Sequence, residues 1–274
     1  MRKLWVLCLA LLLLFCSACG KSDAPPPETQ TVNTVTIMFP EGGTVWQTAK
    51  LLEENGVCTA ESFLEIVRGS TSAYAAAIDG DKRPFLLEGY LFPDTYEFYL
   101  DSSPANALDK FLSNLSVKWS QELQARTDAL EMTMDQVLTL ASVIQKEAGY
   151  ADEMPHVSSV LHNRLDKGMR LQCDVTYYYL QKTVVPYLCA GAWDDDVYEQ
   201  WADLYYTYRF AGLPQGPICN PGMHAIRAAL YPADTEDLYF VTDSDGNFYY
   251  ARTHEKHVRN CKIARNAGTA VTES

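Results

Sequence analysis

The chain has 274 residues, 47% apolar and 12% aromatic, and its 35 acidic residues outnumber its 22 basic ones. This length fits one or two globular domains, and the aromatic content provides enough material for a core to exclude wholesale disorder. The net charge is −13. Proteins that bind nucleic acids hold phosphates with clustered Lys and Arg. Because the sequence shows no such run, we expect no nucleic-acid partner, and a neutral or cationic ligand instead.

The first eighteen residues have the layout of a secretory signal. Two bases precede an apolar run from Leu4 to Phe15. A helix of that length reaches only about 18 Å, against roughly 30 Å for the hydrocarbon core of a bilayer, so we expect a cleaved signal peptide at 1–18 and no membrane helix. The following residues, SACG at 17–20, resemble a bacterial lipobox and predict lipidation of Cys19. The alternative is a cleaved, secreted protein without lipid.

A polar, proline-rich stretch at 19–33 predicts a flexible linker behind the lipidated N-terminus. The pattern then changes to a strand at 34–39, which leads through a turn into helices at about 45–55 and 60–68. We therefore predict a small strand-turn-helix unit at 34–70.

The rest of the chain mixes helices and strands. The predicted elements are a strand and turn within 86–100, helices at about 104–127, 133–148 and 153–167, a strand at 169–174, and a hairpin formed by 238–243 and 247–252 around Asp245-Gly246. Helices and strands that do not alternate regularly indicate the α+β class.

Five cysteines remain once the signal peptide and Cys19 are set aside: Cys58, Cys173, Cys189, Cys219 and Cys261. None has CxxC spacing, so we expect one or two disulfides and at least one free thiol. His254 and His257 fit no common pattern of metal ligands and are expected to lie at the surface or to contact carbohydrate. No phosphate loop or dinucleotide fingerprint is present. We expect no metal and no cofactor.

The helix at about 134–148 has clear ends. Thr133, with a glutamine three residues later, makes a capping box, and Gly149 provides the stop. With about 100° between successive residues, the apolar side chains share one broad arc, and Thr139, Ser142 and Lys146 are expected on the opposite side.

Glu147 falls inside the apolar arc of this helix, between the directions of Leu140 and Val143. A carboxylate there is poorly solvated, so its pKa should rise. A carboxyl group that stays protonated near neutral pH is suited to act as a general acid. The alternative is a glutamate at a helix end whose carboxylate reaches water.

Residues 140–148 (LASVIQKEA) resemble the catalytic helix of the endolytic murein transglycosylases, the MltG or YceG-like family. Further blocks of the family follow along the chain: LEGYLFPDTY at 87–96, NRL at 163–165, GMRLQ at 168–172 with Asp174, Tyr205 with Thr207 and Tyr208, GLPQGPI at 212–218, NPG at 220–222, LYFV at 238–241, and Thr253 with His257. The resemblance spans about 34–262.

The resemblance implies an α+β fold with a LysM-like subdomain at 34–70 and a transglycosylase catalytic domain at 85–262. It implies cleavage of peptidoglycan glycan strands between N-acetylmuramic acid and N-acetylglucosamine, which leaves 1,6-anhydro ends. With Cys19 lipidated, the protein would be extracytoplasmic, anchored to the outer face of the bacterial cytoplasmic membrane. Cell-wall synthesis proteins would then be its expected protein partners.

The chain departs from the family in two respects. Family helices often carry a second acid where this chain has Gln145, and an asparagine and a proline are common where it has Tyr206 and Val175. The remaining acid, Glu147, is the predicted catalytic residue. The alternative, motivated by Gln145, is a non-catalytic peptidoglycan-binding lipoprotein.

A strand at 169–174 would turn Arg170, Gln172 and Asp174 toward one face, where their polar groups could meet sugar. The predicted substrate-binding residues are Glu88, Asn163, Arg164, Gln172, Asp174, Thr207 and Asn220. For Arg164 and Asp174, hydrogen bonding within the domain is an equally open interpretation.

Overall fold

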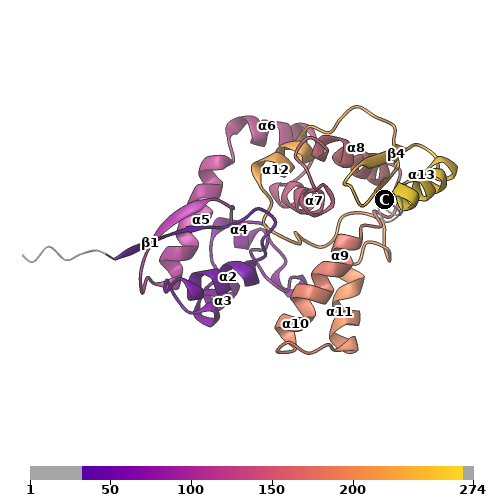
Figure 1. Cartoon of the computed structure of the whole chain (residues 1–274). Helices are drawn as coiled ribbons and strands as arrows, with labels where there is room; N and C mark the ends of the chain where they lie inside the picture. Colours follow the sequence, from indigo (N-terminus) through magenta and orange to yellow (C-terminus); the bar gives the residue numbers. More distant parts are fainter. Residues whose placement is uncertain (1–32, 268–274) are drawn as a thin grey trace, which may run out of the picture. The chain divides into compact units, whose positions relative to one another are not determined.

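The computed structural model describes residues 33–267 and has an α+β fold (Figure 1). Its N-terminal elements are β1 (Thr34–Met38), α2 (Val45–Glu54), α3 (Ala60–Arg68), α4 (Ala73–Ala76), the 3₁₀ turn η1 (Gly80–Lys82) and β2 (Thr95–Tyr99). β1 and β2 form an antiparallel ladder in which Thr34 lies opposite Tyr99. The predicted strand and both predicted helices are confirmed.

The strand that pairs with β1 lies beyond the predicted range 34–70, inside the segment 86–100 where a strand was expected. The N-terminal unit therefore includes β2, which is the partner strand of β1. All described residues from Thr34 onward belong to one compact unit. The division into a LysM-like subdomain and a catalytic domain stays a prediction.

The remainder of the chain is mainly helical. Its elements are α5 (Pro104–Lys118), α6 (Gln121–Ala129), α7 (Met134–Glu147), α8 (Met154–Asp166), α9 (Asp174–Tyr179), the π-helical turn η2 (Leu180–Val184), α10 (Val185–Leu188), α11 (Asp195–Tyr205), α12 (Met223–Leu230), β3 (Tyr239–Thr242), β4 (Phe248–Ala251) and α13 (His254–Ala267). β3 and β4 pair as an antiparallel hairpin, as predicted.

The single helix predicted at 104–127 is wrong: two helices occupy this range. α5 ends at Lys118, and the Ser120 hydroxyl accepts the N–H of Leu123 to cap the start of α6. A serine that caps a new helix satisfies a backbone donor that a continuous helix would satisfy itself, so the chain can turn here without losing the hydrogen bond.

The strand predicted at 169–174 is also wrong. Gln172 has a φ of +54°, in the left-handed region, and α9 begins at Asp174. The carbonyls of Arg170 and Leu171 accept hydrogen bonds from Nη1 of Arg164 (3.1 and 2.7 Å), so a guanidinium takes the place of a partner strand. The predicted separation of faces survives, because Leu171 and Cys173 are buried while Gln172 and Asp174 are exposed.

Helix α7 lies among α8, α9 and α12. The eight residues from Val137 to Ile144 are all buried, so the prediction of a polar face opposite the apolar arc is wrong for Thr139 and Ser142. Ser142 remains hydrogen bonded in the core: its hydroxyl donates to the Thr139 carbonyl (2.7 Å) and accepts the N–H of Ile218 (2.9 Å). The predicted capping box at Thr133 is present.

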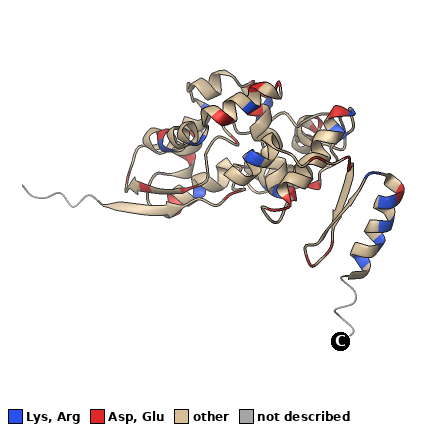
Figure 2. Ribbon diagram, turned by 90° about the horizontal axis from the view of Figure 1, so that it is seen from above, with Lys and Arg blue, Asp and Glu red and all other residues tan. Residues whose placement is uncertain are grey.

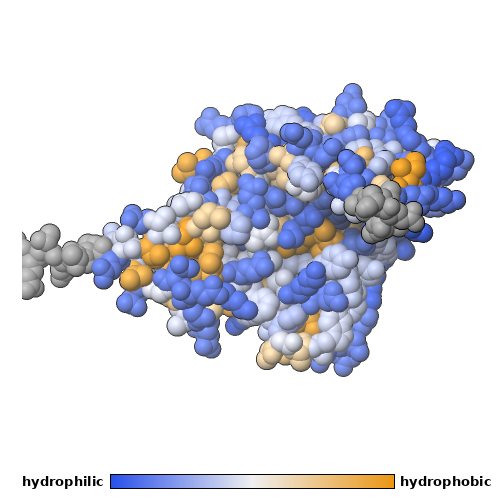
Figure 3. Space-filling model, in the orientation of Figure 1, coloured by the Kyte–Doolittle hydropathy of each residue, from blue (hydrophilic) through white to orange (hydrophobic). Residues whose placement is uncertain are grey.

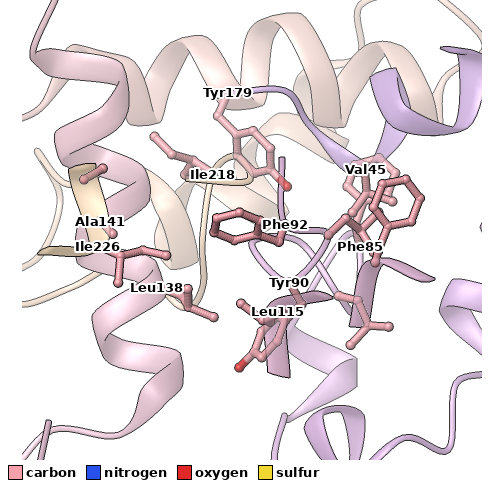
Figure 4. Close-up of a cluster of buried hydrophobic side chains, with 14 of the residues drawn as sticks. Val45, Phe85, Tyr90, Phe92, Leu115, Leu138, Ala141, Tyr179, Ile218 and Ile226 are labelled. Carbon is pink, nitrogen blue, oxygen red and sulfur yellow. The ribbon is translucent and has the colours of Figure 1, made fainter. Parts of the chain in front are cut away.

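The N-terminal elements share one hydrophobic core with α7 and α12. Figure 4 shows the ring of Phe92 between Ala141 of α7 and the side chains of Val45 and Phe85. This irregular segment, which precedes β2, therefore fixes the N-terminal unit against the central helix.

The five described cysteines, Cys58, Cys173, Cys189, Cys219 and Cys261, are all free thiols, so the predicted disulfides are not formed. The predicted signal peptide, Cys19 and nearly all of the linker at 19–33 lie outside the described residues. Within residues 33–267, no helix combines the length and the apolar character needed to cross a membrane.

Phe111 of α5 is fully buried, with ring centroids 4.9 Å from Phe39 and 4.7 Å from Tyr96. We expect Phe111→Ala to lower the free energy of unfolding by about 3–5 kcal/mol, because the cavity it leaves cannot fully collapse. Urea denaturation followed by circular dichroism measures this. The control is Val117→Ala on the same helix, where the side chain is 80% exposed and a change within about 0.5 kcal/mol is expected. A loss below about 1 kcal/mol for Phe111→Ala would contradict this role.

Candidate active site

A cavity of about 420 Å³ lies at the C-terminal end of α7, where Glu147 is the last helical residue. Its walls come from four parts of the chain: α8, the segment 171–174, Tyr208, and the hairpin with the helix that follows it. The lining residues are Glu147, Val160, Leu161, Arg164, Leu171, Gln172, Cys173, Asp174, Tyr208, Tyr239, Phe240, Val241, Thr242, His254, His257 and Cys261. The cavity is thus a pocket of mixed polarity around one end of the central helix.

The pKa of Glu147 is raised to about 7. Burial is the largest cause of the rise, and the negative charge of Asp174 is the second. The nearby Cys173 thiol and the backbone N–H of Val175 oppose it. The predicted rise by desolvation therefore has the expected cause. Near neutral pH this carboxyl group exists in both protonation states, so it can give and take a proton.

Arg164 of α8 lines the cavity and binds the backbone of two neighbouring segments. Its side chain is buried, its Nε donates to the carbonyl of Leu238 (2.6 Å), and its Nη1 binds the carbonyls of the 169–174 segment described above. The guanidinium also lies 5.1 Å from the ring centroid of Tyr239. Arg164 therefore links α8 to both the segment that carries Asp174 and the hairpin.

Asp174 is held in place by Tyr208, whose hydroxyl donates to Oδ1 at 2.8 Å. Asp174 is also the first residue of α9, where a carboxylate is favoured by the positive end of the helix dipole. The site therefore contains a fixed carboxylate whose charge acts on Glu147.

The structure brings together four of the eight predicted site residues: Glu147, Arg164, Gln172 and Asp174 line the cavity. The other four, Glu88, Asn163, Thr207 and Asn220, do not. The predicted single cleft lined by all of them is therefore not what the structure shows.

Asn163 and Thr207 lie behind the cavity wall. The Asn163 amide donates to the carbonyls of Thr235 and Asp237, both at 2.9 Å. The Thr207 hydroxyl accepts the N–H of Cys173 at 3.0 Å. Both side chains therefore fix the backbone of segments that line or approach the site.

Glu88 and Asn220 lie in the core. Glu88 accepts the N–H of Val45 (2.9 Å) and the hydroxyl of Tyr179 (3.3 Å), and burial raises its pKa to about 8. Oδ1 of Asn220 accepts the N–H groups of Gly89 and Leu91. These residues connect the N-terminal unit to the helices around the site.

Gln145, which replaces the second acid of the family helices, does not line this cavity. Its Oε1 accepts the N–H of Gly222 at 2.9 Å, at the start of α12. Two residues further on, about 200° around the helix, Glu147 points in a different direction. The side chain at 145 therefore takes part in helix packing and leaves the surroundings of Glu147 unchanged.

The sequence reasoning did not assign Tyr208, Tyr239 or His254 to the site, although all three line the cavity. The ring of His257 stacks on Tyr239 with centroids 5.2 Å apart. The available signal was the position of all four residues within the ranges of the family blocks at 205–208, 238–241 and 253–257. The hairpin residues line the cavity only because β3 packs beside α8, and the sequence pattern does not show this contact.

The helix that forms this wall, α13, carries four bases along its length, as Figure 2 shows: Lys256, Arg259, Lys262 and Arg265. The bases of this acidic chain are therefore more concentrated than the sequence reasoning found. All four lie on the exposed side of the helix, away from the cavity.

Residues 24–263 match the model of the YceG-like family. The chain belongs to this family. A crystal structure of a YceG-like protein from Listeria monocytogenes at 2.6 Å resolution is similar, with a TM-score of 0.67 and 28% identity over 82% of this chain and 75% of that one. The α+β fold is therefore the fold of this family.

Two curated relatives are named endolytic murein transglycosylase. The protein from Streptococcus pneumoniae is 28% identical over 262 residues, which cover 88% of this chain and 46% of the relative. The protein from Bacillus subtilis is 33% identical over 174 residues, which cover 62% of this chain and 46% of the relative. The chain thus spans about half the length of the curated relatives that it matches.

Replacing Asp174 tests the electrostatics of the cavity. Because the negative charge of Asp174 disfavours ionisation of its neighbour, Asp174→Asn should lower the pKa of Glu147 below about 7, while burial keeps it above the ordinary value of 4.5. NMR titration of carboxyl carbons measures this. Asp166→Asn, at the exposed end of α8 outside the cavity, serves as the control. An unchanged or raised pKa in Asp174→Asn would rule out this coupling.

Proposed function

We propose that this protein is an endolytic peptidoglycan lytic transglycosylase that cleaves glycan strands between N-acetylmuramic acid and N-acetylglucosamine. The observation that carries the proposal is the placement of Glu147, a partly buried acid with a pKa of about 7, in the largely neutral wall of a cavity. Membership of the YceG-like family and the names of the relatives agree with it.

In the mechanism, the protonated carboxyl group of Glu147 donates its proton to the glycosidic oxygen as the bond to C1 of the muramic acid breaks. The resulting carboxylate then takes the proton from the C6 hydroxyl of the same sugar, whose oxygen closes on C1 to give the 1,6-anhydro ring. One residue acts as acid and then as base, and a pKa near neutrality suits both steps.

Asp174 has a supporting role in this reaction. Transition states of glycosidic cleavage carry positive charge on the sugar ring. The Asp174 carboxylate, fixed by Tyr208, lowers the energy of that charge and keeps Glu147 protonated in the ground state. Arg164 has a structural role, because its Nε and Nη1 donate to backbone carbonyls.

The alternative function is a peptidoglycan-binding protein without catalysis, which the sequence motivated through Gln145. The position of Gln145 weakens that motive, because its side chain binds Gly222 outside the cavity. The proposal therefore does not require a second acid on α7.

We further propose that the protein is exported by residues 1–18 and held by a lipid on Cys19 at the outer face of the cytoplasmic membrane, with the LysM-like unit and the catalytic domain facing the cell wall. The support is the sequence pattern of the first 33 residues. There the enzyme would meet nascent glycan strands and cell-wall synthesis proteins.

Glu147→Gln tests the catalytic assignment. We expect at least about a hundredfold loss of anhydro-end formation, because a general acid contributes roughly 10²- to 10⁴-fold to the rate. Mass spectrometry of products from purified glycan strands measures the loss, and retained strand binding with an unchanged melting temperature shows that folding is intact.

The matched control is Glu65→Gln, an exposed glutamate on α3, which should keep full activity. If Glu147→Gln forms anhydro ends at a near-normal rate, Glu147 is not the general acid. If the unmodified protein binds strands but forms no anhydro ends, the non-catalytic alternative is correct.

A further inference from the structure

Five aromatic rings follow one another from the cavity along α9 and α11: Tyr208, Tyr206, Tyr177, Tyr198 and Trp193. We call them the aromatic row. Successive ring centroids lie 5.1, 5.8, 6.0 and 5.3 Å apart, so each ring contacts the next. Tyr208 lines the cavity, and the row therefore starts at the candidate active site.

The row lies at the edge of the hydrophobic interior. Trp193 is 46% exposed, and the four tyrosines are half-buried. The same two helices send other aromatic side chains inward: Tyr179, Trp201 and Tyr205 are buried. Tyr198 and Tyr206 also pack against the core with part of their surface. The row still leaves aromatic surface open next to the cavity, because none of its rings is fully covered, and open aromatic surface that continues from a cavity is suited to bind a ligand.

The chemistry of the row fits sugar. Tyrosine and tryptophan combine an apolar face with a polar edge, which matches a pyranose ring with its apolar C–H faces and its hydroxyl rim. The surface over α9 and α11 is mostly white and pale blue in Figure 3, an intermediate hydropathy without a continuous hydrophobic patch. Two carboxylates accept hydrogen bonds from the row, Asp174 from the hydroxyl of Tyr208 and Asp195 from the indole N–H of Trp193, both at 2.8 Å. Arg209, which lies over Tyr198, is paired with the acids Glu199 and Asp203. The charged groups beside the row are therefore mostly acidic, and because carboxylates accept hydrogen bonds from hydroxyl groups, a polymer rich in hydroxyls is the favoured ligand.

We propose that the aromatic row binds the sugar rings of the glycan strand beyond the bond that is cleaved, and so holds a long strand across the cavity. The proposal rests on the proposed function for the identity of the polymer. It also gives a role to Tyr206, one of the positions at which this chain departs from the family pattern. A row of this kind favours long strands over short fragments, because only a long strand reaches from the cavity to Trp193.

The test measures binding in the Glu147→Gln background, where strands are not consumed. Its probes are peptide-free glycan strands and a single disaccharide of N-acetylglucosamine and N-acetylmuramic acid, followed by calorimetry or fluorescence. We expect Trp193→Ala and Tyr206→Asn each to weaken long-strand binding by about fivefold to tenfold, the loss expected for one aromatic contact. The control, Tyr99→Ala, removes a ring that is 56% exposed on β2, outside the row, and should leave the affinity unchanged.

Two substitutions are used because Tyr206 is the residue that caps the C-terminal end of α11, whereas Trp193 lies in the loop before this helix. Unchanged melting temperatures show that lost affinity is not unfolding. If both variants bind long strands as tightly as the Glu147→Gln parent, the row only packs α9 against α11 and the proposal is wrong. If strand binding depends on the row while the unmodified protein forms no anhydro ends, the row stands and the proposed catalytic function fails.

Discussion

The enclosure of α7 by its neighbours is the constraint on which the site depends. Its residues from Val137 to Ile144 are buried, and its last residue, Glu147, lines the cavity described above. An acid placed at that last turn is therefore partly removed from water, which raises its pKa, and the charge of Asp174 adds to the rise, so that the pKa of Glu147 lies at about 7. The packing around α7 therefore keeps part of the Glu147 carboxyl protonated near neutral pH.

The polar residues of the family blocks have two different roles: some face the cavity, and others bind the backbone around it. Glu147 and Asp174 present carboxyl groups to the cavity, whereas Arg164, Thr207 and Asn220 bind backbone groups and hold the loops that shape it. Arg164 belongs to both groups by position, since it lines the cavity while its donors face carbonyls. A polar residue in a family block is therefore as often a support for the backbone as a contact for the ligand.

Much of this could be predicted from the sequence. The helix that bears Glu147, with its capping box, the two helices after β1 and the hairpin at 239–251 all follow from local periodicity and turn residues, which do not depend on distant parts of the chain. The apolar surroundings of Glu147 also follow from one helix, because its position relative to Leu140 and Val143 is fixed there, whereas its assignment as the catalytic acid came from the resemblance to the family blocks.

The rest depends on contacts between distant segments. The irregular path at 169–174 exists because Arg164 binds its carbonyls, and no pattern within six residues encodes that. The interior positions of Glu88 and Asn220 depend on how the segment around Tyr90 meets α2 and the loop before α12, and the aromatic-rich region of α9 to α11 shows no single period. Burial of Ser142 likewise requires a partner, Ile218, that lies far along the chain.

In the proposed mechanism, a single carboxyl group performs both proton transfers and the attacking oxygen belongs to the sugar. Cleavage of glycan strands in water enriched in oxygen-18, with mass spectrometry of the new ends, tests this most directly. The proposed mechanism predicts 1,6-anhydro ends without oxygen-18, because no water molecule enters the product. Reducing ends that carry oxygen-18 would contradict it, since a second carboxylate, with Asp174 the first candidate, would then activate water for hydrolysis.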